Sequence, residues 1–527
     1  MRVNLSRRRH RVLGTVGLGT CLLACATVAP QPVAARPAAA PCSSNAHAGG
    51  DWPSYGRDQS NSRAQANETA LGPTQLTGVA PAWVFSLSSK NDAGQLESTP
   101  IVTGGCAFVA SSTGVVYALD AVSGAEMWQT TLTARSAGLG GAVVGSLAAD
   151  HGTIIALVDQ AGDGTVGPYV EALDQHTGRV AWTSAAITTL TGYYTNASPQ
   201  VFNGIVFAGF SPPEGDPTGQ GGFALLDARS GRLLTVTPTV SPADQAKGFA
   251  GGGIWSTPAF DPKTGFAYIG AGNPYSKSIE DVHTNAILKI DLRRTSPTFG
   301  AIVASYKGNV DQYTQTLQAL SQTPLCASTA TAPDPLDNPA CGQLDLDFGA
   351  APNLFTANGH LVVGDLQKSG VYHVADAATM SPVWSTIVGA SCQVCNAAST
   401  AVAGGNVYGE GTPFGVEFSM LGSSGSQRWA TPVGDGAHYQ ATSFANGVAY
   451  TFDSTGFLDA FDSETGALLL RRPMTQDAGA PAASLTSGGI AVAYHTLFVA
   501  ASEGGPSLPA PASNGFLIAY RNGSLVP

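Results

Sequence analysis

A short phrase recurs along this chain of 527 residues and constrains its fold more than any other feature. Asp, two residues, Ser or Thr, and Gly follow a strand-like run, and a Trp often stands four residues after the Gly. The phrase is found at 120–124, 174–178, 227–231 and 462–466, with looser copies near 290, 375–384 and 425–429. A repeat of about 40–60 residues with strand patterns between turns is typical of β-propeller blades. The sequence therefore predicts an all-β propeller.

The number of blades and the closure of the ring can also be predicted. The eight candidate blades begin near Ser98, Gly145, Ala197, Trp255, Phe348, Asn396, Tyr439 and Ser484. The last copy, 515–523, stops before its final strand, whereas 78–87 reads as a strand with no blade before it. We expect this N-terminal strand to complete the last blade and to cover two exposed edges. Seven blades is the alternative, because the copies at 396–436 and 484–523 are degenerate.

The first 41 residues read as a signal peptide and a linker. Five arginines precede an apolar run at 12–29, and an Ala/Pro-rich stretch follows at 31–41. The run is too short and wrongly flanked for a membrane span, so we expect an exported protein with one propeller domain at 42–527. The residues 22–25 also resemble a lipobox, which would make Cys25 a lipid anchor. Removing five arginines takes the formal charge from −11 to about −16, which disfavours nucleic acid as a partner.

Export changes how the cysteines are interpreted. Six remain after the leader, and an even number in an oxidising compartment suggests disulfides. We expect the pairs Cys326 with Cys341, Cys392 with Cys395, and Cys42 with Cys106. The first pair falls in a Gln/Thr/Pro/Asp-rich insertion at 309–347, which we interpret as a disulfide-pinned lid.

Several segments together resemble the alcohol dehydrogenases that depend on pyrroloquinoline quinone (PQQ), in particular their polyvinyl-alcohol dehydrogenase-like branch. The opening 51–58 is a common start in that family, and the resemblance extends over about Asp51 to Asn522. More specific are the segments 251–261 with 268–274, 209–214, 344–352 and 363–372. The resemblance implies an eight-bladed quinoprotein that oxidises a secondary or polymeric alcohol and passes electrons to a separate acceptor.

The resemblance also implies a role for individual residues. Trp255 would be the floor on which the flat quinone stacks, and Asn273, Glu214 and Asp347 would bind a catalytic Ca²⁺ through their oxygens. Asp347 would also be the base that takes the alcohol proton, with Asp345 as the alternative. Lys368 would donate to the quinone oxygens, and Ser211 and Asn396 would contact the cofactor.

Two departures from the family pattern bear on this hypothesis. No Cys-Cys dipeptide is available to cap the other face of the quinone, and the corresponding stretch at 138–148 is rich in Gly and Ala. Cys392 and Cys395 are followed by Asn396 where a haem attachment motif needs His, so we expect no haem.

A second class of function has the same repeats. A non-catalytic propeller scaffold of the cell envelope, similar to the lipoproteins of outer-membrane assembly, or a ligand-binding propeller, would not need these residues together. Convergence of Trp255, Asn273, Asp347 and Lys368 at one end of the central channel would favour the enzyme.

Overall fold

The computed structural model describes Cys42 and residues 48–133, 143, 145–159, 167–275, 281–309, 326–327, 346–391, 396–411, 415–433, 440–480, 485–503 and 514–523. By their internal contacts, residues 1–38 and 39–527 form separate units, and all described residues belong to the second. The predicted signal peptide, with Cys25, lies outside the described residues. Among the described helices, none has the length and apolar character needed to cross a membrane.

The unit 39–527 contains eight sheets of the kind that the repeats predict, each built mainly from consecutive antiparallel strands. The last two sheets each add one strand from the N-terminal part of the chain. In chain order the first four sheets are β3 (Ile101–Thr103), β4 (Cys106–Ala110), β5 (Val115–Asp120) and β6 (Glu126–Thr131); β7 (Ala148–Asp150), β8 (Thr153–Val158), β9 (Tyr169–Asp174) and β10 (Val180–Thr183); β11 (Gln200–Phe202), β12 (Ile205–Phe210), β13 (Gly222–Asp227) and β14 (Leu233–Pro238); β15 (Ala259–Asp261), β16 (Phe266–Gly270), β17 (Ala286–Asp291) and β18 (Ile302–Lys307).

The second four sheets contain β20 (Asn353–Ala357), β21 (His360–Leu366), β22 (Val371–Asp376) and β23 (Pro382–Ile387); β25 (Ala401–Ala403), β26 (Asn406–Gly411), β27 (Val416–Leu421) and β28 (Gln427–Pro432); β1 (Ala64–Gln65), β29 (Ser443–Ala445), β30 (Val448–Phe452), β31 (Phe457–Asp462) and β32 (Leu468–Pro473); β33 (Leu485–Ala493), β34 (Thr496–Glu503), β35 (Gly515–Asn522) and β2 (Val79–Ser86). The described helices are short: α1 (Pro242–Gln245), α2 (Met474–Ala478), η1 (Leu76–Gly78) and η2 (Leu87–Lys90).

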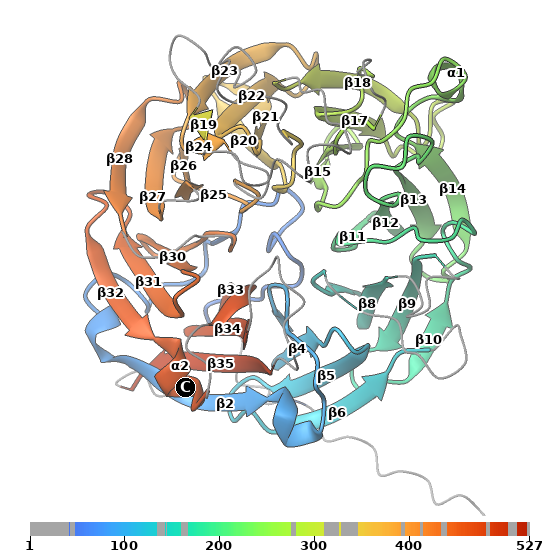
Figure 1. The fold of residues 1–527 in the computed structure, drawn as a ribbon. Helices are drawn as coiled ribbons and strands as arrows, with labels where there is room; N and C mark the ends of the chain where they lie inside the picture. Colours follow the sequence, from blue (N-terminus) through green and yellow to red (C-terminus); the bar gives the residue numbers. More distant parts are fainter. Residues whose placement is uncertain are drawn as a thin grey trace, which may run out of the picture. The chain divides into compact units, whose positions relative to one another are not determined.

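The prediction of eight blades is confirmed, and so is the closure of the ring. The N-terminal strand β2 pairs antiparallel with β35, the last strand of the chain, from Val79 opposite Asn522 to Ser86 opposite Phe516. Figure 1 shows this blue strand beside the red strands of the last sheet, with the other sheets set around a common centre. The outer edge of the last sheet is therefore covered by a strand from the other end of the sequence.

The recurring phrase has a physical explanation in each blade. The Asp side chain at its start accepts hydrogen bonds from the following backbone and from Ser or Thr, as Asp120 does from Ser123 N (2.8 Å) and Oγ (2.7 Å). The Gly then adopts a left-handed conformation, with φ 72° at Gly124. The Trp of the preceding blade covers this Gly and donates its indole N–H to the same turn: Trp83 covers Gly124 and bonds Ala121 O (3.3 Å). The same contact joins Trp128 to Gly178, Trp182 to Gly231, Trp384 to Gly425 and Trp429 to Gly466. Trp rings therefore dock between neighbouring blades.

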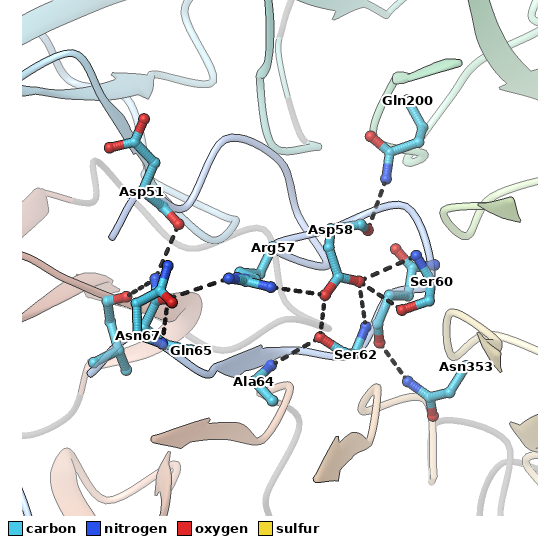
Figure 2. Close-up of polar contacts among 12 residues, drawn as sticks. Asp51, Arg57, Asp58, Ser60, Ser62, Ala64, Gln65, Asn67, Gln200 and Asn353 are labelled. Atoms are coloured by element: carbon cyan, nitrogen blue, oxygen red, sulfur yellow. Dashed lines mark hydrogen bonds and ion pairs between the residues drawn. The ribbon is translucent and has the colours of Figure 1, made fainter. Parts of the chain in front are cut away.

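The opening segment 51–65 runs along the inner strands and bonds to all eight sheets. Backbone or side-chain bonds link Trp52 to Val102, Pro53 to Ala149, Asp58 to Gln200, Gln59 to Phe260, Ser60 to Leu354, Ser62 to Val402, Arg63 to Phe444 and Gln65 to Val492. Figure 2 shows how the Asp58 carboxylate folds this segment, accepting from Ser60, Ser62 and Arg57. The segment therefore acts as an inner hoop that ties the blades together.

The structure bears on part of the cysteine predictions. Cys42 and Cys106 form a disulfide with 5.5 Å between their Cα atoms, as expected, and it joins the chain before the hoop to β4. Cys341, Cys392 and Cys395 lie outside the described residues, so the other two pairs stay predictions. Residues 310–325 and 328–345 of the insertion, including Asp345, also lie outside the described residues. The short strand β19 (Cys326–Ala327) pairs with β24 (Ala390–Ser391).

A buried carboxyl pair lies between the sheet of β25–β28 and the next. Glu410 and Glu417 face each other directly across β26 and β27, and both are fully buried. The nearby Asp453 and Asp459 are paired with Arg471, at 2.7 Å and 3.0 Å. Burial raises the pKa of both glutamates well above the usual range; the Asp453 charge adds to this for Glu410.

These pKa shifts predict a stability that falls as the pH rises. A carboxyl whose pKa is raised on folding binds more protons in the folded state, so the free energy of unfolding decreases from about pH 4.3, the usual glutamate pKa, up to the raised value. We expect Glu417→Gln to flatten this decrease, because it removes one titrating group and one charge beside Glu410. Urea unfolding from pH 4 to pH 9 measures the slope. Parallel curves for the wild type and Glu417→Gln would contradict the prediction.

Candidate functional site

All the predicted site residues lie at one edge of their sheets. Trp255, Asp347 and Asn396 come four to six residues before the inner strands β15, β20 and β25, while Ser211, Asn273 and Lys368 follow the ends of β12, β16 and β21. In each sheet the first two strands are antiparallel neighbours, so the beginning of one meets the end of the next. The repeated topology thus brings these residues to the same end of the blades.

A glycine-rich segment positions Trp255. Gly251 exchanges backbone hydrogen bonds with Gly219 and Gly221 on one side (2.8 and 2.9 Å), and Gly252 N donates to Asn273 O on the other (2.8 Å). A Cβ on Gly251, whose φ is 103°, would lie 2.1 Å from Asn273 O. Only glycine therefore allows three chain segments to pass this close together.

Trp255, Asp347 and Lys368 are in mutual contact. The Trp255 indole Nε1 donates to Asp347 Oδ2 at 2.8 Å, and Lys368 Nζ pairs with Asp347 Oδ1 at 2.8 Å. Lys368 Nζ also lies 5.0 Å from the centre of the Trp255 ring, within the range of a cation–π interaction. Both charged side chains are at least nine-tenths buried, which strengthens their attraction. Three separate segments thus converge on one carboxylate.

Ser211 and Asn273 lie next to this group. A Cβ on Gly253 would meet Ser211 Oγ at 2.5 Å, and one on Gly272 would lie 3.4 Å from Asp347 Oδ2. The Ser211 hydroxyl is buried and has no hydrogen-bond partner among the described residues. Asn273 is 4% exposed, with its side-chain oxygen buried. Ser211 therefore lies against Gly253, two residues before Trp255, and Asn273 follows Gly272, which passes close to the Asp347 carboxylate.

Asn396 and Glu214 are placed differently. Asn396 is fully buried and donates to the backbone carbonyls of Lys368 (3.2 Å) and Ala390 (2.7 Å), so it holds the turn that carries Lys368. Glu214 is exposed on the bend after β12. Burial raises the pKa of Tyr194. The charges of Glu214 and Asp347 add to this shift, and the charge of Lys368 opposes it.

Three titratable residues whose charges or pKa values link them to this group, Tyr194, Asp159 and Glu97, are not predicted from the sequence. The Asp159 carboxylate accepts from Thr195 N at 2.7 Å, and its charge adds to burial in raising the pKa of Glu97. The signal was available, because Glu97 and Tyr194 precede β3 and β11 by four and six residues, as Trp255 and Asp347 precede their own inner strands. Aligning the blades on their inner strands would have found both.

The residues fit a flat, oxygen-rich cofactor with a hard cation. The buried Ser211 hydroxyl has no hydrogen-bond partner among the described residues, and carboxylate and amide oxygens are the ligands that Ca²⁺ prefers. Over the described part of the chain, no three His, Cys, Asp or Glu side chains cluster closely enough to hold a metal on their own. A metal at this site would therefore need the Asn273 amide or the oxygens of the cofactor.

Comparison with known proteins identifies the fold family. Residues 74–310 match the family model described as outer membrane protein assembly factor BamB. The polyvinylalcohol dehydrogenase of a Pseudomonas species is 26% identical over 347 residues, which cover 62% of this chain and 49% of that protein. The polyvinylalcohol dehydrogenase of a Sphingopyxis species is 24% identical over an alignment that covers 84% of this chain and 69% of that protein. The crystal structure of quinohemoprotein alcohol dehydrogenase from Comamonas testosteroni superposes with a TM-score of 0.64 at 16% identity, covering 90% of this chain and 81% of that one. The chain has the propeller fold of the quinoprotein alcohol dehydrogenases.

The likeness to these proteins is broad but partial. The chain spans about half the length, or less, of the first curated relatives that it matches. BamB from Moraxella catarrhalis superposes with a TM-score of only 0.51, at 15% identity. The fold comparison therefore agrees better with the quinoprotein dehydrogenases than with the assembly factor.

Proposed function

We propose that this quinoprotein alcohol dehydrogenase-like propeller oxidises an alcohol, secondary or polymeric, with PQQ and Ca²⁺ at the Trp255–Asp347–Lys368 site. The observation that carries the proposal is the contact of one buried carboxylate with an indole N–H and an ammonium group, at 2.8 Å each. A scaffold has no need to bury such a charged pair, because desolvation costs roughly several kcal/mol per ion.

The chain's own residues have distinct tasks in this reaction. Trp255 would support the quinone plane, and Ser211 would give it a hydrogen bond. Asn273, Asp347 and the more exposed Glu214 would hold Ca²⁺. When bound, PQQ supplies the carbonyl carbon that takes up hydride from the carbinol carbon. Asp347 would take the hydroxyl proton of the alcohol, and Lys368 would stabilise negative charge that develops on the oxygens beside it.

We further propose that the protein is exported and passes electrons to a separate acceptor. The support is the arginine-rich leader and the Cys42–Cys106 disulfide, a bond typical of oxidising compartments. Quinohemoproteins are among the relatives, whereas Asn396 follows Cys395 here, so we expect a preparation without haem absorbance. The N-terminal sequence of the secreted protein would show where the leader is cleaved and whether Cys25 is retained.

Reconstitution tests the proposal. The purified chain is titrated with PQQ and Ca²⁺, and dye-linked oxidation is assayed with primary, secondary and polymeric alcohols. Turnover with one class of alcohol would support the dehydrogenase and define its substrate. Failure to bind PQQ at all would overturn the proposal and favour a scaffold.

A further inference from the structure

A hydrogen-bonded network lies directly behind the Lys368–Asp347 pair, and its centre is His373 on β22. The imidazole Nε2 lies 3.1 Å from Gln367 Oε1, and Nδ1 lies 3.0 Å from the Tyr306 hydroxyl. His373 is 4% exposed and Gln367 is fully buried. No step of the proposed reaction uses these side chains.

The network has a single consistent arrangement of protons. Gln367 Nε2 donates to Asn309 O (2.8 Å), and Asn309 N donates to Gln367 Oε1 (3.0 Å), which fixes the orientation of the amide. Because Gln367 Oε1 can only accept, His373 Nε2 must carry the proton, and Nδ1 must accept from Tyr306. Burial lowers the pKa of His373 to about 3, which agrees with a neutral ring at physiological pH.

His373 contacts the neighbours of both charged site residues. Through Gln367 it supports the turn on which Lys368 is the next residue, and this turn is closed by Gly370 N to Gln367 O (2.9 Å). Its ring also packs edge-on against Phe348, the residue after Asp347, with 5.6 Å between ring centres. One imidazole thus touches the chain beside each member of the ion pair.

We propose that His373 is a positioning residue for the Lys368–Asp347 pair, held in its Nε2–H form by Tyr306 and Gln367. This inference rests on the proposed function. Groups that orient the residues around a reactive centre typically change affinity or activity about 10–100-fold when they are altered. The network is therefore expected to matter to chemistry more than to stability.

The chain offers a matched pair of substitutions. Tyr306 and Tyr268 lie on β18 and β16 of one sheet, and both donate a hydroxyl to the sheet of β20–β23. Tyr306 donates to His373, whereas Tyr268 donates to the Ala377 carbonyl (2.7 Å), in the turn after β22. Tyr306→Phe and Tyr268→Phe each remove one such hydrogen bond, but only the first frees the His373 ring.

We expect Tyr306→Phe to lower kcat about tenfold and to weaken PQQ binding, with little change in the KM for the alcohol. Tyr268→Phe is expected to lose similar stability in thermal unfolding but to keep kcat and PQQ affinity. A readout without cofactor is the ¹⁵N spectrum of the histidines. His373, assigned with His373→Gln, should show the Nε2–H tautomer in both proteins, and in Tyr306→Phe the Nδ1 signal should shift to that of a ring nitrogen that accepts no hydrogen bond.

The outcomes separate the inference from the proposed function. Wild-type protein that neither binds PQQ nor turns over would overturn the function, and the inference with it. Wild-type turnover with equal kcat and PQQ affinity in the two Phe variants would overturn the inference alone. An Nδ1–H tautomer for His373 would also overturn it, because the network could then not have the bonds described.

Discussion

Asp347→Asn is expected to reduce dye-linked alcohol oxidation by about 10²–10⁴-fold, the range typical of a lost general base. The substitution keeps the shape of the side chain, and its amide oxygen can still accept from Trp255 Nε1, which now lies 2.8 Å from Oδ2. It removes the charge that would take the alcohol proton and that now pairs with Lys368. The Kd for PQQ, measured by fluorescence titration, separates loss of chemistry from loss of cofactor.

Asp365→Asn is the matched control. Asp365 is fully buried, and burial raises its pKa well above the usual range; Asn has nearly the same shape and carries no charge. It lies close to Phe348, since a Cβ on Gly270 would contact both Asp365 Oδ2 and Phe348. We expect Asp365→Asn to keep turnover near that of the wild type. Full turnover in Asp347→Asn, with loss in Asp345→Asn, would instead assign the base to Asp345.

Much of the fold could be predicted because the repeat encodes it locally. The phrase acts over short distances: its Asp closes the turn, its Gly adopts a positive φ, and the Trp packs on the Gly of the neighbouring blade. Each copy of the phrase is therefore evidence for the same contact. The strand 79–86 could be assigned to the last blade because it lacked partners nearby and 515–523 lacked one at its edge. The role of the segment 51–65 could not be predicted, because its bonds reach all eight sheets and leave no periodic pattern.

The site was predictable only in part, for a similar reason. Trp255, Asp347 and Lys368 stand in recognisable segments, and the structure brings them together. Tyr194 joins them through the arrangement of blades, with no motif of its own. Asn396 was expected at the cofactor, whereas the structure shows it bonded to the Lys368 carbonyl; whether it also reaches a bound quinone stays a prediction. Networks between blades, such as that around His373, depend on register across sheets that the sequence does not display.

Arg63 is the residue of the inner hoop whose loss should cost the most stability. Its side chain is fully buried and donates to Tyr55 O (2.6 Å), Thr442 O (2.8 Å) and Ser443 Oγ (2.9 Å), thereby joining the hoop to the sheet of β29–β32. It also stacks on the Tyr55 ring, at 4.7 Å from the ring centre. Its charge lies near buried Glu410 and opposes the rise of that carboxyl's pKa.

Arg63→Met is therefore expected to lower the free energy of unfolding by about 3–5 kcal/mol, the usual cost of removing one partner from a buried charged cluster. The methionine fills part of the space but cannot donate to the carbonyls of Tyr55 and Thr442, and the Tyr55 carbonyl keeps only the longer bond from Trp52 Nε1 (3.4 Å). Arg57→Met is the control, because Arg57 belongs to the same hoop and its side chain is 21% exposed, paired with Asp58 at 3.0 Å. Such a pair typically contributes about 1 kcal/mol or less. Urea midpoints measure both, and equal midpoints for the two variants would show that the hoop holds the blades through its backbone alone.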